Sequence, residues 1–550
     1  MGMDSKVTLS DAQHMEHMDQ SAQKQLALQG EALETLEKTY GLWESVRANK
    51  LCLLYMLAAY ACAAVYGYDT IANGASLAMP AFELYFGHFD VATKELYLDS
   101  IWTSLWSSMT NVGSILGSAV AGPMSQKIGR RYTGMAFGAV TTVGVIVQYT
   151  ATAKGTLLAG KMINGLAVGG LLAVGTTYAS EISPPRLRGV LLGGLAFCVI
   201  AMQLIGLAVV RSFVPNLHPS AFRTVFALQW VVGALPIIAF LFAPESPTYL
   251  VMKGKPLAAH SSLARLYGKN NNIDARLAHL QSGILHEMQK DANTAASYWH
   301  CFQGTDLKRT LTVCLIMFGN GLLGTALLTQ NIYFLTLTSL PVIHAFDINI
   351  AGFGLALVIM PLAWRFGDRI GRRPLYLIGV VGNILALATI GGLGYATYSN
   401  TGAVWAIAIL MNLLIVWQQP TNSMVSWSMP PELSSYKLRQ HTQSISIIVQ
   451  AFTSWLFAFV TPYMYNVGAG SGNLGAKTGF VFMGTSIILL LVSYFVIPET
   501  KGLTTEEIDF LYESKVSPRS FGSVKVLGPR AADKVELKSW SQKSGVTSES

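Results

Sequence analysis

The sequence predicts an all-α polytopic membrane protein with 12 transmembrane helices in two six-helix bundles. Of its 550 residues, 51% are hydrophobic and only 12% are charged, which is about half the charge of an average soluble domain. Apolar runs of membrane-crossing length recur along the chain, and three unlike motifs repeat in the same order in its two halves. The 51 glycines suit helices that pack closely in a bilayer.

The apolar runs occur in two sets of six, each run long enough to cross a hydrocarbon core of about 30 Å. The first set lies near 51–74, 103–124, 132–152, 156–180, 190–212 and 224–243, and the second near 310–335, 345–364, 374–397, 403–429, 442–465 and 478–497. A polar stretch separates them. The chain therefore divides into an N-terminal tail (1–48), a first bundle (49–247), a linker (248–308), a second bundle (309–500) and a C-terminal tail (501–550).

The loop charges predict how these spans are oriented. Eleven cations lie in the loops after spans 2, 4, 8 and 10: Lys127, Arg130, Arg131, Arg186, Arg188, Arg365, Arg369, Arg372, Arg373, Lys437 and Arg439. The opposite loops hold five: Lys94, Lys154, Arg211, Arg223 and Lys477. The positive-inside rule then places both tails and the linker in the cytosol, and we expect the plasma membrane. This pattern accounts for the net charge of +8 without a nucleic-acid partner.

Three repeated motifs support the division into two bundles. "GRR" occurs at 129–131 and at 371–373, "E-x6-R" at 181–188 and at 432–439, and "PESP" after span 6 is echoed by "PETKG" after span 12. Any one of these motifs would be weak by itself, but their common order indicates a duplicated six-span unit.

Charged residues of these motifs are candidates for a cytosolic gate. Arginines at helix ends can bond carbonyls and acids of a neighbouring helix, holding the cytosolic ends together until they part. The alternative is that the cations only fix topology. The candidate gating residues are Arg130, Arg131, Glu181, Arg188, Glu245, Asp368, Arg372, Arg373, Glu432, Arg439 and Glu499.

These motifs resemble the sugar-porter family of the major facilitator superfamily (MFS). "GYDT" in span 1, "TTYASEISPPRLRG", "CFQGTDLKRT" and "PETKGLTTEEIDFLYE" are similar to fungal α-glucoside:proton symporters of the maltose type. The resemblance covers about residues 45–521. It implies the MFS fold, alternating access, and a sugar and protons as the transported species.

Several positions depart from the family pattern. The acid of the first "GRR" motif is replaced by Gln126, whereas its repeat keeps Asp368. The acid that usually precedes the span-1 aspartate is Tyr66, and the usual span-11 arginine is Ile447. These changes weaken the resemblance at the transport centre without removing it.

Asp69 and Lys161 are the candidates for proton coupling. A carboxylate inside an apolar span is costly, unless Asp69 caps a helix end or faces a loop. In other sugar-porter proton symporters a span-1 aspartate pairs with a span-4 arginine, here Lys161. We expect the two charges to form a pair that opens when Asp69 is protonated. The alternative is a static ion pair that fixes helix packing.

The resemblance and the chemistry of sugars suggest the substrate-binding residues. Amides suit vicinal hydroxyls and aromatic faces suit the apolar side of a ring. Isolated amides can instead bond a neighbouring helix, and a tryptophan can anchor at the membrane interface. The candidates are Gln203, Asn320, Gln330, Asn331, Tyr333 and Trp427.

The leading functional hypothesis is proton-coupled uptake of an α-glucoside or related di- or oligosaccharide. The competing hypothesis is a transporter-like sugar sensor with a cytosolic signalling partner. We expect no enzyme, since the sequence has no nucleophile–base constellation, metal motif or phosphate loop, and no cofactor or metal.

Overall fold

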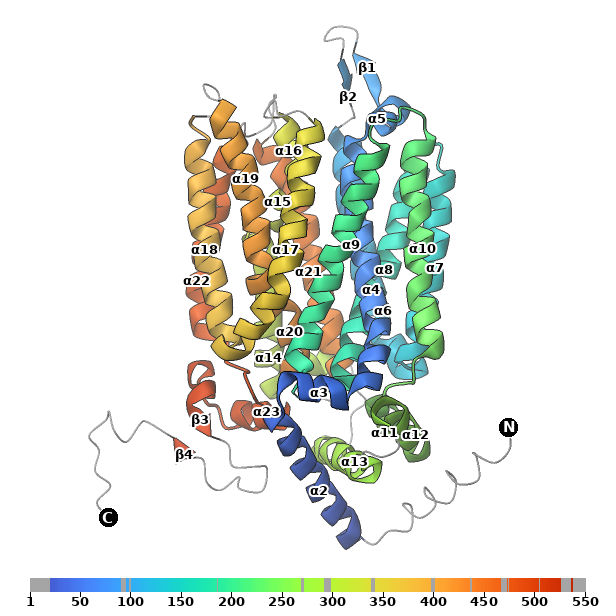
Figure 1. The fold of residues 1–550 in the computed structure, drawn as a ribbon, viewed down its shortest axis with the longest axis vertical. Coiled ribbons are helices and arrows are strands. Elements are labelled where there is room, and N and C mark those ends of the chain that lie inside the picture. The colour runs from blue at the N-terminus through green and yellow to red at the C-terminus, as the bar shows by residue number, and fades with distance from the viewer. Residues whose placement is uncertain are drawn as a thin grey trace, which may run out of the picture.

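The structure is a computed structural model that describes residues 20–537 apart from 91–94, 98–99, 185, 269–271, 291–297, 338–341, 397–400, 436–437, 466–471, 473, 504 and 526–535. Long helices run side by side through the body of the molecule, and shorter helices gather at one end (Figure 1). The predicted all-α fold is confirmed. Strands in the described part are limited to two short pairs, β1 (His88–Asp90) with β2 (Glu95–Tyr97) and β3 (Val524–Lys525) with β4 (Glu536–Leu537).

The first six predicted spans form the N-terminal half. They are α4 (Lys50–Gly74), α6 (Ser100–Ile128), α7 (Arg130–Thr150), α8 (Lys154–Ile182), α9 (Arg188–Phe213) and α10 (Ser220–Phe242). Helix α8 packs against α4, α6 and α7. Its glycines and alanines leave little side-chain volume, so that neighbouring helices can approach it closely.

The other six spans form the C-terminal half, and two of them are interrupted. Span 7 consists of α14 (Gly304–Leu322), α15 (Thr325–Thr329) and α16 (Asn331–Leu337), and span 10 of α19 (Thr401–Gln418), the π-helical turn η3 (Gln419–Ser423) and α20 (Met424–Leu433). The rest are α17 (Val342–Ile370), α18 (Arg372–Leu393), α21 (Arg439–Tyr465) and α22 (Thr478–Val496). Gly324 divides span 7 because its φ of 78° is left-handed, a conformation that favours glycine.

The two ends of the bundle carry different short elements (Figure 1). One end, which we call the linker face, carries α2 (Gln20–Thr39), α3 (Leu42–Ala48), α11 (Pro247–Met252), α12 (Pro256–Tyr267), α13 (Ile273–Lys290), η2 (Tyr298–Phe302), α23 (Thr505–Glu513) and η5 (Pro518–Ser523). The other end, the hairpin face, carries η1 (Ala75–Ala78), α5 (Pro80–Phe86), the β1–β2 hairpin and η4 (Gly475–Lys477).

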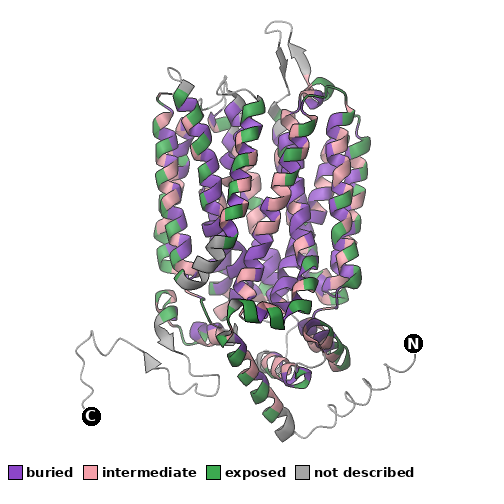
Figure 2. Cartoon of the chain, in the orientation of Figure 1, coloured by how far each residue is buried: buried purple, intermediate pink, exposed green. Residues whose placement is uncertain are grey.

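The outer surface of the bundle is apolar, as a membrane-spanning protein requires. Among the described residues, nine helical segments are long and apolar enough to cross a bilayer. Residues coloured as exposed lie along the outer sides of the long helices, and residues coloured as buried lie towards the interior of the bundle (Figure 2). Leu385, Phe242 and Val358 are among the large apolar residues that are more than half exposed. Lipid tails would cover such residues.

Candidate functional site

Arg130 is the centre of a buried charge network at the linker face of the N-terminal half. Its guanidinium forms two hydrogen bonds with Glu181 at the end of α8, Nη2 to Oε1 at 2.8 Å and Nε to Oε2 at 3.0 Å. The side chains of Arg130 and Glu181 are 1% and 0% exposed. Such a bidentate pair satisfies both charges at once, and removing either partner would leave a buried charge alone.

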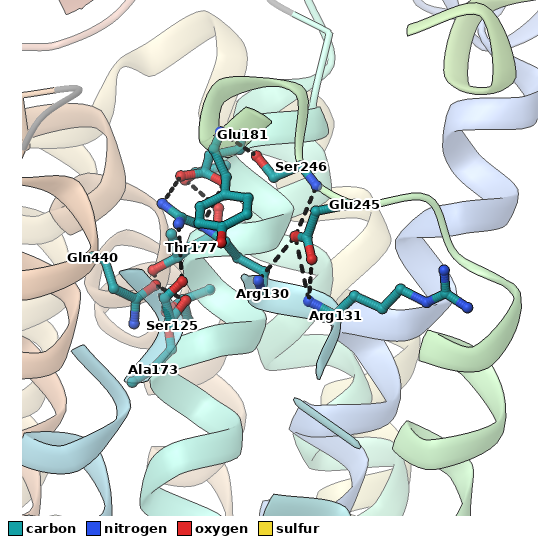
Figure 3. A network of polar contacts seen from close by, with 12 residues as sticks. Ser125, Arg130, Arg131, Ala173, Thr177, Glu181, Glu245, Ser246 and Gln440 are labelled. Carbon is teal, nitrogen blue, oxygen red and sulfur yellow. Dashed lines mark hydrogen bonds and ion pairs between the residues drawn. The ribbon is translucent and has the colours of Figure 1, made fainter. Parts of the chain in front are cut away.

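Glu245 caps the first turn of α7 (Figure 3). Its carboxylate accepts hydrogen bonds from the backbone amides of Arg130 at 2.9 Å and Arg131 at 3.2 Å, and from Ser246 at 3.0 Å. An acid at a helix N-terminus satisfies amides that lack partners in the helix. Burial raises the pKa of the Glu245 carboxyl above its ordinary 4.5, although these backbone hydrogen bonds and Arg130 oppose the shift.

The same arrangement recurs in the C-terminal half. Glu499 accepts hydrogen bonds from the backbone amides of Arg372 at 3.0 Å and Arg373 at 3.3 Å. The Arg372 guanidinium lies 3.4 Å from the Glu432 carboxylate, and the Thr500 hydroxyl donates to Glu432 at 2.7 Å. The sequence repeat is therefore also a repeat of contacts.

The second arginine of each "GRR" motif bonds the carbonyl end of another helix in its own half. Arg131 donates to the carbonyls of Phe240 at 2.8 Å and Leu241 at 2.6 Å near the end of α10, and Arg373 donates to Tyr494 on α22 at 2.8 Å. These bonds tie the third helix of each half to its sixth. The networks of Arg130 and Arg372 thus stabilise each half as a unit.

The remaining gating candidates lie nearby. Arg188, at the start of α9, and Arg439, at the start of α21, line one pocket with Glu181. The side chain of Asp368 lies outside the described part of the structure. Neutral contacts join the halves beside Arg130: Ser125 lies 3.5 Å from Gln440 (Figure 3). The gating roles stay predictions.

Asp69 lies on α4 and is buried within the N-terminal half. Its Oδ1 accepts hydrogen bonds from Asn164 on α8 at 2.5 Å and from Gln229 on α10 at 3.5 Å. A small crevice beside it also reaches Thr141 of α7. Because these partners all belong to one half, the carboxylate points into that half. Asp69 lies well inside its helix, five residues before its last residue.

Lys161 lies close to Asp69 without contacting it. Its ammonium donates to the backbone carbonyl of Asn73, 3.4 Å away and one turn beyond Asp69 on α4. Both charged residues are buried, Lys161 at 0% and Asp69 at 4% exposed. Among contacts between described residues, the two form no direct ion pair. The direct pair expected from the sequence is therefore not formed in this structure, because the ammonium bonds a backbone carbonyl and the carboxylate bonds two amides. Their role in proton coupling stays a prediction.

Trp427 and Tyr66 face each other across the two halves. Their ring centroids are 6.4 Å apart with planes at 61°. Trp427, on α20, is only 6% exposed, which argues against an anchor at the membrane surface. Of the amides expected to bind sugar, Gln203 on α9 is half-buried, and half-buried Asn320 on α14 accepts a hydrogen bond from Ser426 at 3.2 Å.

The other two amide candidates bond to helices of their own half. Gln330 donates to the Ala458 carbonyl at 3.2 Å and accepts from the Tyr465 hydroxyl at 2.9 Å. Asn331 donates to Asn349 on α17 at 3.1 Å. These contacts favour the interhelical alternative in this conformation. The side chain of Tyr333 lies outside the described part.

Sequence reasoning missed three residues that the structure places at these sites. Asn164, three residues after Lys161, holds Asp69. The sequence shows Tyr66 only as the loss of an acid, whereas the structure places its ring opposite Trp427. Tyr298 of η2 donates to the Ala119 carbonyl of α6 at 2.6 Å and packs on the His441 ring of α21, 4.5 Å between centroids, and so bridges the halves. Helical spacing from Lys161 would have placed Asn164 on the same face of span 4, whereas the positions of Tyr66 and Tyr298 depend on tertiary packing.

Comparison with known proteins agrees with this architecture. The family model described as "Sugar (and other) transporter" matches residues 55–512. "MFS transporter fmqE" of Aspergillus fumigatus is 43% identical over 501 residues, covering 89% of this chain and 92% of that protein. The "General alpha-glucoside permease" of Saccharomyces cerevisiae is 27% identical over 467 residues, covering 84% of this chain and 75% of the permease.

A solved structure shares the fold. The proton:xylose symporter XylE bound to 6-bromo-6-deoxy-D-glucose superposes with a TM-score of 0.71 at 20% identity, covering 84% of this chain and 99% of XylE. The families and folds found are those of transporters and not of enzymes. This chain therefore belongs to the sugar (and other) transporter family, the sugar porters of the major facilitator superfamily, and is a multi-pass membrane transporter.

Proposed function

We propose that the chain carries an α-glucoside or a related di- or oligosaccharide into the cell together with protons, by alternating access. The observation that carries the proposal is the buried carboxylate of Asp69, held by Asn164 and Gln229, with the buried Lys161 bonded to the Asn73 carbonyl one turn further along α4. An ionisable group inside a membrane bundle is costly and is retained mainly where it serves transport. The linker face lies in the cytosol in this proposal.

Protonation of Asp69 is the step that couples the proton to the protein. When the carboxylate is ionised, it balances the Lys161 ammonium within the same low-dielectric region. A proton that enters from the hairpin face and binds Asp69 removes that balance and weakens the hydrogen bonds from both amides. The N-terminal half then rearranges around Lys161, and the proton leaves Asp69 when the site faces the cytosol.

The sugar binds between the halves beside Trp427 and Tyr66. The rings offer apolar faces, and Gln203 and Asn320 offer amides for hydroxyls. Asn320 accepts from Ser426 through its Oδ1, and its amide N–H groups can donate to a sugar hydroxyl. The names of relatives support the substrate class, because several are permeases of α-glucosides or maltose at 27–28% identity.

Uptake of labelled maltose, cellobiose, lactose and glucose in transporter-null cells tests the proposal, with external pH recorded. We expect accumulation of at least one α-glucoside with alkalinisation of the medium. Asp69→Asn and Lys161→Met should abolish the alkalinisation. Lys154→Met, at the start of the same helix, is the matched control and should keep it. Coupled uptake that survives Asp69→Asn would contradict the mechanism.

Sensing is the second candidate. The Lys161 ammonium bonds to the Asn73 carbonyl rather than to Asp69, which is also compatible with a fixed polar core in a receptor. Saturable sugar binding by the purified protein without accumulation in cells would favour the sensor. Binding and accumulation that are lost together in Trp427→Ala would favour the transporter.

A further inference from the structure

Among the described elements, α6 and α21 form the most extensive contact between the two halves. Helix α6 belongs to the N-terminal half and α21 to the C-terminal half. Near the linker face, Ser125 of α6 donates to the side-chain carbonyl of Gln440 of α21 at 3.5 Å, beside the Arg130 network (Figure 3). Opening of the linker face must separate the two helices, so the side chains between them then face the passage.

The first two turns of α21 are polar although they are buried. Within residues 439–446 only Ile445 is apolar, and every residue of this segment is at most 6% exposed. Across the interface, Ser125 of α6 is also polar and is 0% exposed. Polar groups cost free energy when they are buried. Packing between the halves alone would therefore favour apolar side chains at these positions.

The two sides of this segment of α21 have different neighbours. Ile445 packs with Cys301 of η2, and the Thr442 hydroxyl lies 3.9 Å from the same thiol. This side faces the C-terminal half, whereas Gln440 faces α6. Gln443 follows Gln440 by three residues, which places both on one side of the helix. Gln443 therefore lies on the side of α21 that faces the N-terminal half.

Both glutamines carry an amide nitrogen without a partner. Gln440 and Gln443 are each 1% exposed, and the Nε2 atom of each forms no hydrogen bond with a described residue. A buried donor that is left unpaired is costly, and it gains partners when the halves part and water or a ligand fills the passage. The amides therefore favour the open linker face, where they can donate hydrogen bonds.

We propose that Gln440 and Gln443 form a second binding site for sugar, on the path by which it leaves through the linker face. This inference rests on the proposed transport function. The unpaired groups are uncharged amides, which suit the hydroxyls of a neutral sugar. The site is separate from the one beside Trp427, because α6 covers it in this conformation and only opening of the linker face exposes it.

The rate of opening of the linker face tests the cost of the unpaired amides without any sugar. Ser125→Cys, in a protein whose five native cysteines are replaced by alanine, places a reporter in the interface. Its modification by a maleimide is measured from the linker face. Gln443→Met removes the amide and keeps the length of the side chain, so it should slow this modification by about fivefold or more. An unchanged rate would mean that the amide is paired in the closed state, and the proposal would fall.

Thr442→Val is the matched control. Thr442 is 4% exposed, precedes Gln443 in the sequence, and faces η2 on the other side of α21. The change removes a polar group at nearly constant volume, as Gln443→Met does, but away from the interface. The reporter should therefore react at its original rate. Equal slowing by both changes would reflect a general effect on α21 and would contradict a special role of Gln443.

Sugar analogues test contact between the amides and the sugar. Sealed vesicles are loaded with whichever of maltose, cellobiose, lactose and glucose accumulates in the uptake assay. The half-saturating concentration at the linker face is then compared with that of its single-deoxy analogues. The loss caused by at least one missing hydroxyl should be about 2- to 10-fold smaller in Gln440→Met or Gln443→Met than in the native protein. A conformational effect alone would change the values for all analogues by one factor.

The outcomes separate this site from the transport function. Accumulation of a sugar, with the same analogue losses in the native and variant proteins, would overturn the exit site and leave the proposed transport intact. Accumulation of none of the four sugars by the native protein would contradict the proposed function, and this inference with it.

Discussion

The ion pair between Arg211 and Asp347 should stabilise closure of the hairpin face. Arg211 is near the end of α9 in the N-terminal half, and Asp347 is near the start of α17 in the C-terminal half. Their Nε and Oδ1 atoms are 3.1 Å apart. The pair therefore joins the two halves at the face opposite the linker. Opening of the hairpin face must separate these charges.

The exposure of the pair limits its strength. The two side chains are 29% and 50% exposed, and ion pairs at such sites contribute about 0.2–1 kcal/mol. Removing one charge should therefore shift the equilibrium towards the open hairpin face by about 1.4- to 5-fold. Arg211→Asp replaces attraction by repulsion, which about doubles the free-energy change to roughly 0.4–2 kcal/mol, a shift of about 2- to 30-fold.

A charge swap provides the decisive assay. Ala345→Cys, in an otherwise cysteine-free protein, places a reporter at a buried position of α17, and its rate of maleimide modification is measured from the hairpin face. Arg211→Asp and Asp347→Arg should each raise the rate, and the double variant should return it close to the starting value. Salt at about 0.5 M should shrink the differences.

The matched control is Arg223→Asp at the same face. Arg223 stacks on the Tyr85 ring, 5.5 Å from its centroid, within the N-terminal half. The same change of charge there should leave the reporter rate unchanged. If the double variant reacts as fast as the single variants, the pair does not hold the halves together and the reasoning fails.

Three other perturbations have outcomes that follow from the contacts. Gly129→Ala should lower the unfolding temperature, because Gly129 has a φ of 94° and a Cβ there would collide with the Glu245 carboxylate. A backbone at φ 94° and ψ 169° costs a residue with a Cβ about 1–3 kcal/mol, so an unchanged melting curve would disprove this packing. Glu245→Gln tests the raised pKa of that carboxyl. A folded-state pKa above the ordinary 4.5 means that the folded protein binds the proton more tightly. The stability of the native protein relative to this variant should then be greatest below pH 4.5 and fall as pH rises above it, and a rise would refute the assignment. Asn164→Leu removes a donor to Asp69 and should destabilise the ionised carboxylate by about 1.5–3 kcal/mol. The dependence of uptake on external pH should then differ from that of the native protein. Asn164→Asp lacks the amide donor as well, so it should not restore the native pH dependence.

The positions of the long helices could be predicted because their physical cause is local. A run such as 190–212 is apolar all round, and only a helix satisfies its backbone in a bilayer. The interruption at Gly324 was not predicted, because a glycine in a membrane helix is ordinary and only its φ of 78° reveals the break. The π-helical turn at 419–423 likewise depends on how span 10 packs against its neighbours.

The candidate sites were predictable in part for the same reason. The repeated motifs predicted Glu245 and Glu499 as gating residues. They did not predict that these glutamates cap helices, because their partners are backbone amides, which have no signature in the sequence. The expected pairing of Asp69 with Lys161 rested on their opposite charges and on the family resemblance. The structure satisfies the carboxylate with Asn164 and Gln229, and neutral amides inside a span carry no comparable sequence signal.

The paired networks suggest how the halves move. Arg130 and Arg372 each bind an acid of their own half, so these bonds can persist while one half rotates against the other. What changes is the set of contacts between halves, such as Ser125 with Gln440 at the linker face and Arg211 with Asp347 at the hairpin face. Each such contact shifts the equilibrium between the open and closed states only by the difference in its free energy between those states. Loss of the Arg211–Asp347 pair should therefore favour states with an open hairpin face at the expense of states with an open linker face. Ser125 is 0% exposed and lies 3.5 Å from Gln440 of the other half, so a cysteine introduced by Ser125→Cys should react more slowly with a maleimide when the outer pair is lost.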